Sequence, residues 1–505
     1  MSSKVLTSSI LGLDGYKVEV ECDISPGMPK FTIVGLPDTA VQEARERVRS
    51  AMRASDLPFP RPKITINLAP ADLKKSGTGF DLPMAIAILM ANGDLPFCNP
   101  QKRIFIGELA LDGSLRPVPG ALSTALLAKE LEVEELIVPL HNLNETTLVR
   151  QQKVFPAANL REVVEHIMGV KKLSPAEPRQ LEPPKTNINC PDFSAIRGQE
   201  QAKRALEIAA AGGHNILLQG PPGSGKTLLA RTFSSILPEL TYDEAMDITR
   251  IHSVAGILPR QGFINQRPFR SPHHTASGVS LVGGGSIPKP GEVSLAHRGV
   301  LFLDEFPEFS RNVLENLRQP LEDGFVTVSR AQGTVCFPAR FSLIAAMNPC
   351  RCGYATDPER ACCCTPVQII NYRKRLSGPL LDRIDLMIEV PRVPTERLVD
   401  LTAGESSEAI RARVQTARNR QQARFKDINL LTNADLSSDQ VRRLISLTDA
   451  ARTLLKQAVD KYRLSARAYF RVLKITQTIA DLAATDMVDA AHVAEALQYR
   501  QTSDI

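Results

Sequence analysis

Apolar and polar residues alternate in two segments near the start of the chain. The alternation runs through residues 18–24 and again through residues 64–68. A period of two predicts strands with one buried face. Residues 83–90 are continuously apolar and begin at a proline, which the first turn of a helix tolerates, so we expect a helix there. Short apolar runs at residues 104–106 and 136–138 predict two further strands.

Proline then interrupts this pattern. Residues 171–191 contain five prolines and little apolar periodicity, which predicts a linker. We therefore expect residues 1–170 to form an α/β domain of their own. Within it, Asp112-Gly113 predicts a hairpin turn, because this dipeptide suits the positive backbone angles of tight hairpins.

Residues 192–391 show short apolar runs separated by helical or glycine-rich stretches. One run ends before residue 220, and three more lie at residues 300–303, 342–346 and 386–390. This order predicts a doubly wound α/β sheet that binds a nucleotide. Residues 392–505 have a helical pattern without a strand signal, so we expect an all-α domain at the C-terminus.

A phosphate-binding loop follows the first of these apolar runs. The pattern Gly-x4-Gly-Lys-Thr lies between an apolar strand and an apolar helix start. Its glycines let backbone N–H groups close around phosphate oxygens, and the helix directs its positive end at the same anion. Lys226 is expected on the β- and γ-phosphates of ATP, and Thr227 on Mg²⁺. The predicted site comprises Gly220, Pro221, Pro222, Gly223, Ser224, Gly225, Lys226 and Thr227.

Polar side chains suited to hydrolysis follow two of the later strands. Asp304 and Glu305 come directly after the run at residues 300–303, and Asn348 follows the run at residues 342–346. We expect Asp304 to hold Mg²⁺ through water, Glu305 to polarise the attacking water, and Asn348 to orient that water beside the γ-phosphate. The structural alternatives are a capped strand end for the two acids and a simple turn at Asn348.

Two arginines are candidates for sensing the γ-phosphate. Arg383 precedes the last predicted strand and is placed to act on a neighbouring subunit's phosphates, or else to pair with Asp385 at the surface. Arg467 opens a helix of the all-α region and is either a second sensor or part of a solvated helix start.

Cysteine is concentrated in one short segment. Cys350, Cys352, Cys362 and Cys364 form two C-x-C pairs, and Cys363 adds a fifth thiol that could exchange with a neighbour. In a cytosolic chain such a cluster favours a metal over disulfides, and four thiolates suit a structural Zn²⁺. The alternative is a cluster of reduced surface thiols.

Composition narrows the function classes. The chain has 505 residues, 43% hydrophobic and 23% charged, without an apolar run of membrane-spanning length. The first residues resemble no signal peptide, so we expect a cytoplasmic protein without membrane contact. The net charge of +6 is too mild to prove a nucleic-acid partner. Aromatic residues make up 5% and tryptophan is absent, which weakens the case for base stacking but not for phosphate contacts. Basic residues gather at 45–63 and 411–426, where phosphate binding and a solvated face are both open.

The motifs in this order resemble the AAA+ ATPases, and more narrowly their magnesium-chelatase branch. That resemblance rests on Arg-Pro-Phe-Arg-Ser-Pro-His-His at 267–274, on Pro290-Gly-Glu-Val-Ser-Leu-Ala-His-Arg-Gly and the Asp-Glu strand, and on Leu321-Glu-Asp-Gly. With the Asn-Pro-Cys-Arg-Cys-Gly-Tyr segment, the whole chain looks like the bacterial ComM/YifB family. The resemblance implies pore insertions at about 253–295 and a β-hairpin at about 325–340, which the alternation around Gln332-Gly333 supports independently. A pore-loop role is expected for His273-His274.

This resemblance implies a ring, most simply a hexamer, that hydrolyses ATP. Its expected action is DNA translocation, specifically branch migration of recombination intermediates during natural transformation. Residues 1–170 resemble the Lon protease fold, but the slots of its Ser nucleophile and Lys base hold Gly79 and Leu122, with Ser76 nearby. We therefore expect a domain without peptidase chemistry.

Two rival functions remain open at this point. One is a chelatase motor subunit that drives metal insertion into a tetrapyrrole through partner proteins. This function ranks second, because a chelatase motor subunit usually lacks the N-terminal domain and the cysteine cluster that this chain has. The other is an ATP-dependent protease, which requires a Ser/Lys pair that the sequence does not supply.

Overall fold

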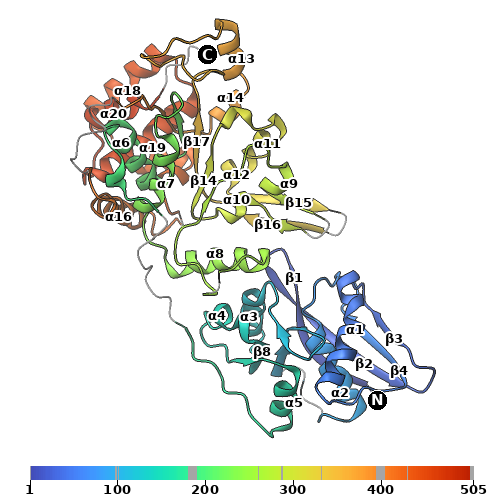
Figure 1. Ribbon diagram of the computed structural model, residues 1–505. Helices are drawn as coiled ribbons and strands as arrows, with labels where there is room; N and C mark the ends of the chain where they lie inside the picture. Colours follow the sequence, from blue (N-terminus) through green and yellow to red (C-terminus); the bar gives the residue numbers. More distant parts are fainter. Residues whose placement is uncertain are drawn as a thin grey trace.

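A computed structural model describes residues 2–96, 99, 102–179, 190–259, 261–285, 288–330, 333–393, 404–428 and 430–500. Figure 1 shows an N-terminal domain, in blue and cyan, and a larger body that contains most of the described residues after 190. Residues 171–179 of the predicted linker contain neither helix nor strand, and residues 180–189 lie outside the described residues.

The N-terminal domain is built on a seven-stranded mixed sheet in the order β3-β4-β2-β1-β5-β8-β9. Strands β1 and β2 form a long antiparallel pair, whereas β5, β8 and β9 continue the sheet in parallel. The predicted strands at 18–24 and 64–68 are confirmed as parts of β2 and β4. The strands are β1 (Ser2–Leu11), β2 (Asp14–Ser25), β3 (Phe31–Val34), β4 (Lys63–Ala69), β5 (Arg103–Phe105), β8 (Glu135–Pro139) and β9 (Val154–Ala157).

Helix α2 (Asp81–Asn92) contains the predicted helix at residues 83–90 and is buried over almost its whole length. This explains why its sequence is continuously apolar instead of amphipathic. Asp112-Gly113 lies between β6 (Glu108–Leu109) and β7 (Leu115–Arg116), which pair antiparallel as predicted. The remaining helices are α1 (Thr39–Ala54), α3 (Ala121–Glu130), α4 (Leu143–Thr146) and α5 (Leu160–Met168).

The second body contains a five-stranded, all-parallel sheet in the order β11-β14-β17-β10-β18. This is the predicted α/β nucleotide-binding core. Parallel strands bring their carboxyl ends to one edge, and that edge receives the P-loop, Asp304 and Asn348. The strands are β10 (Ile216–Gln219), β11 (Phe269–Arg270), β14 (Val300–Leu303), β17 (Ser342–Met347) and β18 (Leu386–Glu389).

A helical region follows the sheet, as predicted for residues after 392. Its described helices share one hydrophobic core with α6 (Glu200–Gly212) and α7 (Lys226–Ile236) of the sheet layer. Residues 394–403, 429 and 501–505 of this predicted domain lie outside the described residues. Its helices are α16 (Ser407–Arg424), α17 (Ser438–Leu444), α18 (Asp449–Tyr462), α19 (Ala466–Leu482) and α20 (Ala490–Gln498).

Helix α8 (Tyr242–Ala255) lies between the two bodies (Figure 1). Its Arg250 donates to the Leu13 carbonyl at 3.0 Å and to the Asp14 carboxylate at 2.5 Å, and its Tyr242 hydroxyl donates to the Leu148 carbonyl. The N-terminal domain is therefore docked on an element of the core.

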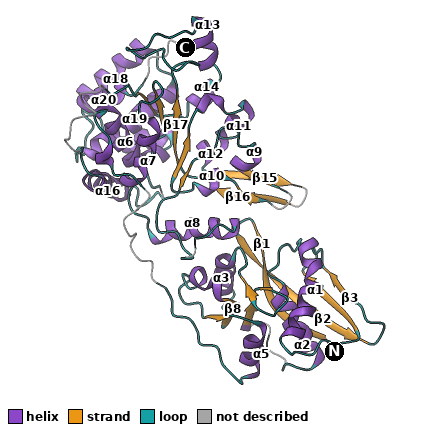
Figure 2. Ribbon diagram, viewed as in Figure 1, coloured by secondary structure: helices purple, strands orange, loops and turns teal. Residues whose placement is uncertain are grey.

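Short elements between α8 and β17 occupy the segments where insertions were predicted. Strands β15 (Phe325–Arg330) and β16 (Gly333–Pro338) form the predicted β-hairpin, and Figure 2 shows it projecting from the core. Gln332 of its predicted turn lies outside the described residues. No described helix is both long and apolar enough to cross a membrane. The other short elements between α8 and β17 are α9 (Gly278–Val282), β12 (Gly283–Gly284), β13 (Lys289–Pro290), α10 (Glu292–Leu295), α11 (Arg311–Glu315) and α12 (Arg318–Asp323). Two more short helices, α13 (Pro366–Arg373) and α14 (Gly378–Leu381), follow β17.

Candidate nucleotide site

The P-loop connects the end of β10 to the start of α7 at Lys226. Gly223 and Gly225 have φ angles of 76° and 87°, which only glycine adopts without strain. A Cβ added to Gly220 would lie 2.1 Å from the Val390 carbonyl oxygen. The glycines of the motif are thus required by backbone conformation and by the close passage of the chain after β18.

Lys226 is buried beneath this loop. Its Nζ donates to the carbonyls of Gly220 at 2.7 Å and Pro221 at 2.8 Å, and lies 3.3 Å from the Asn348 amide oxygen. Burial lowers the pKa of Lys226 to about 8. Lys226 and Asn348, which the sequence predicted separately, are therefore brought together across the ends of β10 and β17.

Thr227 and Asp304 meet at the same edge of the sheet. The Thr227 hydroxyl donates to Asp304 Oδ2 at 3.0 Å, and Asp304 Oδ1 accepts the backbone N–H of Glu305 at 2.9 Å. A hydroxyl and a carboxylate side by side are oxygen donors of the kind that Mg²⁺ prefers. These side chains fit the predicted magnesium site beside the P-loop.

Glu305 has a partner that the sequence did not predict. Its Oε2 lies 3.1 Å from His274 Nδ1, and its backbone has a left-handed φ of 51°. His274 follows β11, and its ring packs against that of His273 with centroids 4.1 Å apart. The paired histidines were visible in the motif at 267–274, but only the fold shows that one of them reaches the carboxylate expected to act on water.

A cavity of about 350 Å³ lies beside the P-loop. It is bounded by Gly223–Gly225, by Ala195–Gln199 and by Arg392. Gln199 Nε2 donates to the Ser224 carbonyl at 2.6 Å, so the segment before α6 holds the loop from one side. Sequence reasoning predicted Gly223–Gly225 but missed Gln199 and Arg392, because no motif marks them.

The two arginines predicted to act on phosphate lie apart from these contacts. Arg383 donates to the Pro379 carbonyl at 2.6 Å and pairs with Glu322, not with Asp385. Arg467 is exposed in the first turn of α19 and makes no ion pair within the part of the chain that the structure describes. Neither side chain is joined to the P-loop of its own chain by a described hydrogen bond.

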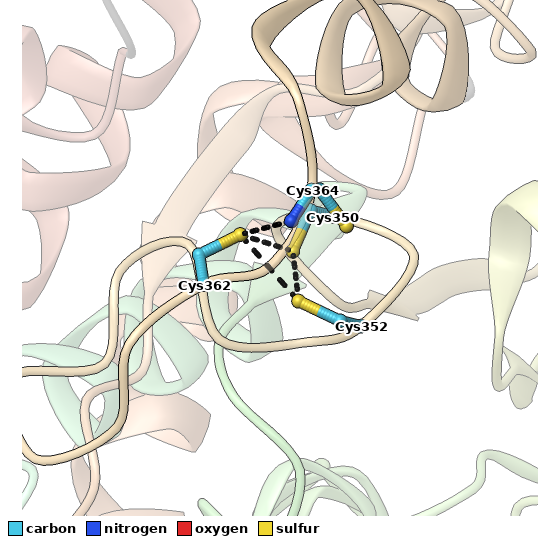
Figure 3. Close-up of side chains that lie close together, drawn as sticks. All are labelled: Cys350, Cys352, Cys362 and Cys364. Carbon is cyan, nitrogen blue, oxygen red and sulfur yellow. Dashed lines mark hydrogen bonds between the residues drawn. The ribbon is translucent and has the colours of Figure 1, made fainter.

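The four predicted cysteines converge in the loop after β17 (Figure 3). The sulfurs of Cys350, Cys352 and Cys362 lie 3.3 to 3.6 Å apart, and all four ligand atoms fall within 4.8 Å of one another. Tetrahedral zinc with Zn–S bonds of about 2.3 Å requires sulfurs about 3.8 Å apart, so the cluster fits that metal. The N–H of Tyr354 lowers the pKa of Cys352 to about 5, and Cys363 is exposed and lies outside the group.

The basic helices are engaged within the chain. On α16, Arg413 pairs with Glu207 and Glu405, Arg420 with Asp486, and Arg424 with Asp481. On α1, Arg47 pairs with the buried Asp81 at 2.7 Å. Carboxylates outside residues 411–426 thus pair with three arginines of that acid-free stretch, which reduces the positive charge that α16 offers to phosphate.

Comparisons with known families match three segments of the chain. Residues 192–398 match a family described as "Magnesium chelatase, subunit ChlI". Residues 20–142 match "Subunit ChlI of Mg-chelatase", and residues 404–500 match "Magnesium chelatase, subunit ChlI C-terminal".

Several relatives match along nearly the whole chain, among them proteins of Haemophilus influenzae and Escherichia coli. "Competence protein ComM" of Haemophilus influenzae is 46% identical over 98% of this chain and 97% of its own length. "Uncharacterized protein YifB" of Escherichia coli is 45% identical over 99% of this chain and 97% of its own. By contrast, the magnesium-chelatase 67 kDa subunit of Chlorobaculum parvum is 27% identical over only 31% of this chain and 23% of its own length.

Proposed function

Because the chain belongs to the magnesium-chelatase-like ComM/YifB family, we propose that it is a ring-forming AAA+ ATPase that moves DNA. Its specific action would be branch migration of recombination intermediates during natural transformation. The competence name of the Haemophilus influenzae relative supports this action, and the similarity to that relative spans the whole chain.

The single observation that carries the ATPase assignment is the convergence of the P-loop with Asp304 and Asn348 at one edge of a parallel sheet. Bound ATP would place its phosphates against the P-loop amides, with Lys226 turning from the loop carbonyls toward the β- and γ-phosphates. Thr227 and Asp304 would hold Mg²⁺, which neutralises charge developing on the phosphates. Glu305 would polarise the attacking water and Asn348 would orient it.

The remaining predicted residues act between subunits in this proposal. Arg383 would leave Glu322 and reach the γ-phosphate bound by a neighbouring copy, while Arg467 of the helical region would sense the same phosphate. A trans-acting arginine needs a neighbour at every interface, which a closed ring such as a hexamer provides. Zinc held by Cys350, Cys352, Cys362 and Cys364 would stiffen the loop that follows Asn348.

A second candidate is a motor subunit that remodels a partner protein for metal insertion. The magnesium-chelatase descriptions of all three matched segments favour it. We rank it lower because the chelatase subunit of Chlorobaculum parvum matches less than a third of this chain. Protease activity ranks lowest, since no described Ser–Lys hydrogen bond occurs near Ser76 or Gly79.

The test is the steady-state ATPase rate of the purified chain with and without branched DNA, with casein, and with a porphyrin plus chelatase partner subunits. We expect DNA alone to raise the rate. The Glu305→Gln variant should bind ATP but hydrolyse it at least about 100-fold more slowly, as expected for loss of a general base. A rate that DNA leaves unchanged, or that the porphyrin system raises instead, would overturn the DNA assignment.

A further inference from the structure

A second polar cavity lies at the opposite end of the core sheet from the P-loop. Its volume is about 90 Å³, and it reaches Gly299 and Ser342, which directly precede or begin strands β14 and β17. Leu431 and Thr432 of the helical region close another side. The cavity therefore lies where the sheet meets the C-terminal helices.

The charged lining of this cavity is unbalanced. Four arginines face two carboxylates, which leaves an excess of two positive charges. The arginines come from the segment before β11, the two segments before β14 and β17, and helix α16. They are Arg267, Arg298, Arg340 and Arg418, and the acids are Glu244 and Asp435.

Both carboxylates already accept hydrogen bonds from other groups of the chain. Glu244 accepts from Arg267 at 3.0 Å, and it also caps the first turn of α8. Asp435 accepts from the backbone N–H of Thr432 at 3.1 Å and from its hydroxyl at 2.9 Å. Only Arg267 among the four arginines is therefore neutralised by an ion pair in the described chain.

The other three guanidinium groups have no carboxylate partner among the residues that the structure describes. Arg298 Nε is buried with no hydrogen-bond acceptor, and Arg298 makes no side-chain hydrogen bond among the described residues. Within the described chain, Arg418 donates to the Ala210 carbonyl alone, at 3.2 Å from Nε and 2.8 Å from Nη2. Burial lowers the pKa of Arg298, and it lowers the pKa of Arg418 to about 10. Arg340 is the exposed member of the set.

Buried charge without a counter-charge is costly, and a protein retains it where something compensates it. The guanidinium fork matches the oxygens of phosphate, and several forks around a small cavity can satisfy one tetrahedral anion. We propose that this arginine cavity, defined by Arg298, Arg340 and Arg418, binds a single phosphate group. The group is either free inorganic phosphate or one phosphate of a nucleic-acid backbone.

This proposal stands apart from the ATPase assignment, and its test keeps the two separate. The full chain carries Lys226→Ala in every sample, which weakens phosphate binding at the P-loop. Melting temperature and calorimetric binding are measured with inorganic phosphate and, separately, with a single-stranded oligonucleotide, against chloride at equal ionic strength. The variants are Arg298→Met, which keeps the length of the side chain, and Arg340→Met, whose exposed position leaves folding intact. Arg360→Met serves as the control, because Arg360 is exposed and stacks on Tyr354 away from the cavity.

We expect phosphate to raise the melting temperature of the parent, because a ligand that binds only the folded state stabilises it. Arg298→Met and Arg340→Met should each weaken phosphate binding at least tenfold, and Arg360→Met should not. Protection by the oligonucleotide alone, lost in the same two variants, identifies a backbone phosphate as the ligand. The proposal is overturned if neither ligand protects the parent, or if both cavity variants bind as the parent does.

Discussion

Lys226 shows how a single residue links nucleotide binding to pH. Its folded-state pKa is about 8, because burial disfavours the ammonium form. Bound phosphates favour that ammonium form, so above pH 8 binding of ATP must take up a proton at Lys226. We expect ATP affinity to fall by up to about tenfold per pH unit well above pH 8 and by only about twofold between pH 7 and 8.

Calorimetry of ATP binding in two buffers of different ionisation enthalpy measures this proton uptake directly. At pH 9 the apparent enthalpy should depend on the buffer, and at pH 7 much less. The Lys226→Ala variant should bind more weakly and lose the buffer dependence. Equal proton uptake in the variant and the parent would show that another group titrates.

His274 is the residue at the site that the sequence did not assign to catalysis. Because its ring nitrogen engages Glu305 at 3.1 Å, the carboxylate is less available to a water molecule. We expect His274→Ala to raise the basal kcat for ATP by up to about fivefold, the equivalent of roughly 1 kcal/mol for a contact between partly exposed side chains. The KM for ATP should stay unchanged.

The neighbouring histidine provides the matched control. His273 contacts Thr275 at 2.9 Å and stacks on His274, but has no described contact with Glu305. His273→Ala should therefore leave kcat near the wild-type value. A lower kcat in His274→Ala would mean that this histidine assists Glu305 instead of restraining it.

The loop that carries Cys350, Cys352, Cys362 and Cys364, called here the cysteine loop, lies next to the P-loop. A Cβ on Gly353 would lie 2.6 Å from Pro222, so this loop packs directly against the P-loop. We expect Cys350→Ser with Cys352→Ser to lose bound zinc, since two of four ligands are removed, and to lower the ATPase rate. Metal analysis and the ATPase rate measure the two effects.

The fifth cysteine makes this test specific. Cys363 is exposed and lies outside the sulfur cluster, so Cys363→Ser should keep both zinc and activity. Equal zinc content in the double variant and the wild type would remove the proposed metal site.

Elements were predictable from the sequence where local rules fix them. The strand–loop–helix at the P-loop and the acids after β14 follow from motif and strand direction, and both lie where the sequence placed them. The environment of α16 was not predictable. Residues 411–426 contain no acid in the sequence, yet Glu207 of α6 pairs with Arg413 and Asp481 of α19 pairs with Arg424. Side-chain pairing between distant elements requires the tertiary fold, which periodicity does not encode.

At the scale of the whole molecule, α8 ties the N-terminal domain to the core. Ser253 of this helix donates to the carboxylate of Glu145, and burial raises the pKa of that carboxyl group. Arg250 donates to the Leu13 carbonyl in the turn between β1 and β2. The insertion that begins after α8 carries His274 toward the site. The N-terminal domain is thus fixed to the same element that leads toward the edge of the sheet where the P-loop lies, an arrangement that no sequence pattern indicated.

The ring proposal predicts that two inactive variants restore each other. Lys226→Ala abolishes a subunit's own site but keeps Arg383, whereas Arg383→Ala keeps the site but lacks the trans residue. In an equimolar mixture, about a quarter of the interfaces in a randomly assembled ring combine both intact residues. We expect the mixture to recover about that share of the wild-type ATPase rate, measured after co-assembly with ATP. No recovery, with mixed rings verified, would place Arg383 outside the shared site.

Movement of a DNA junction is the most direct test of ATP-driven branch migration by this protein. A labelled three-strand or four-way junction is incubated with the protein and ATP, and the strand products are followed over time. We expect wild-type protein to convert the junction to branch-migrated products, and Glu305→Gln to bind the junction without converting it. Intact junctions under conditions where the wild type hydrolyses ATP would contradict this expectation.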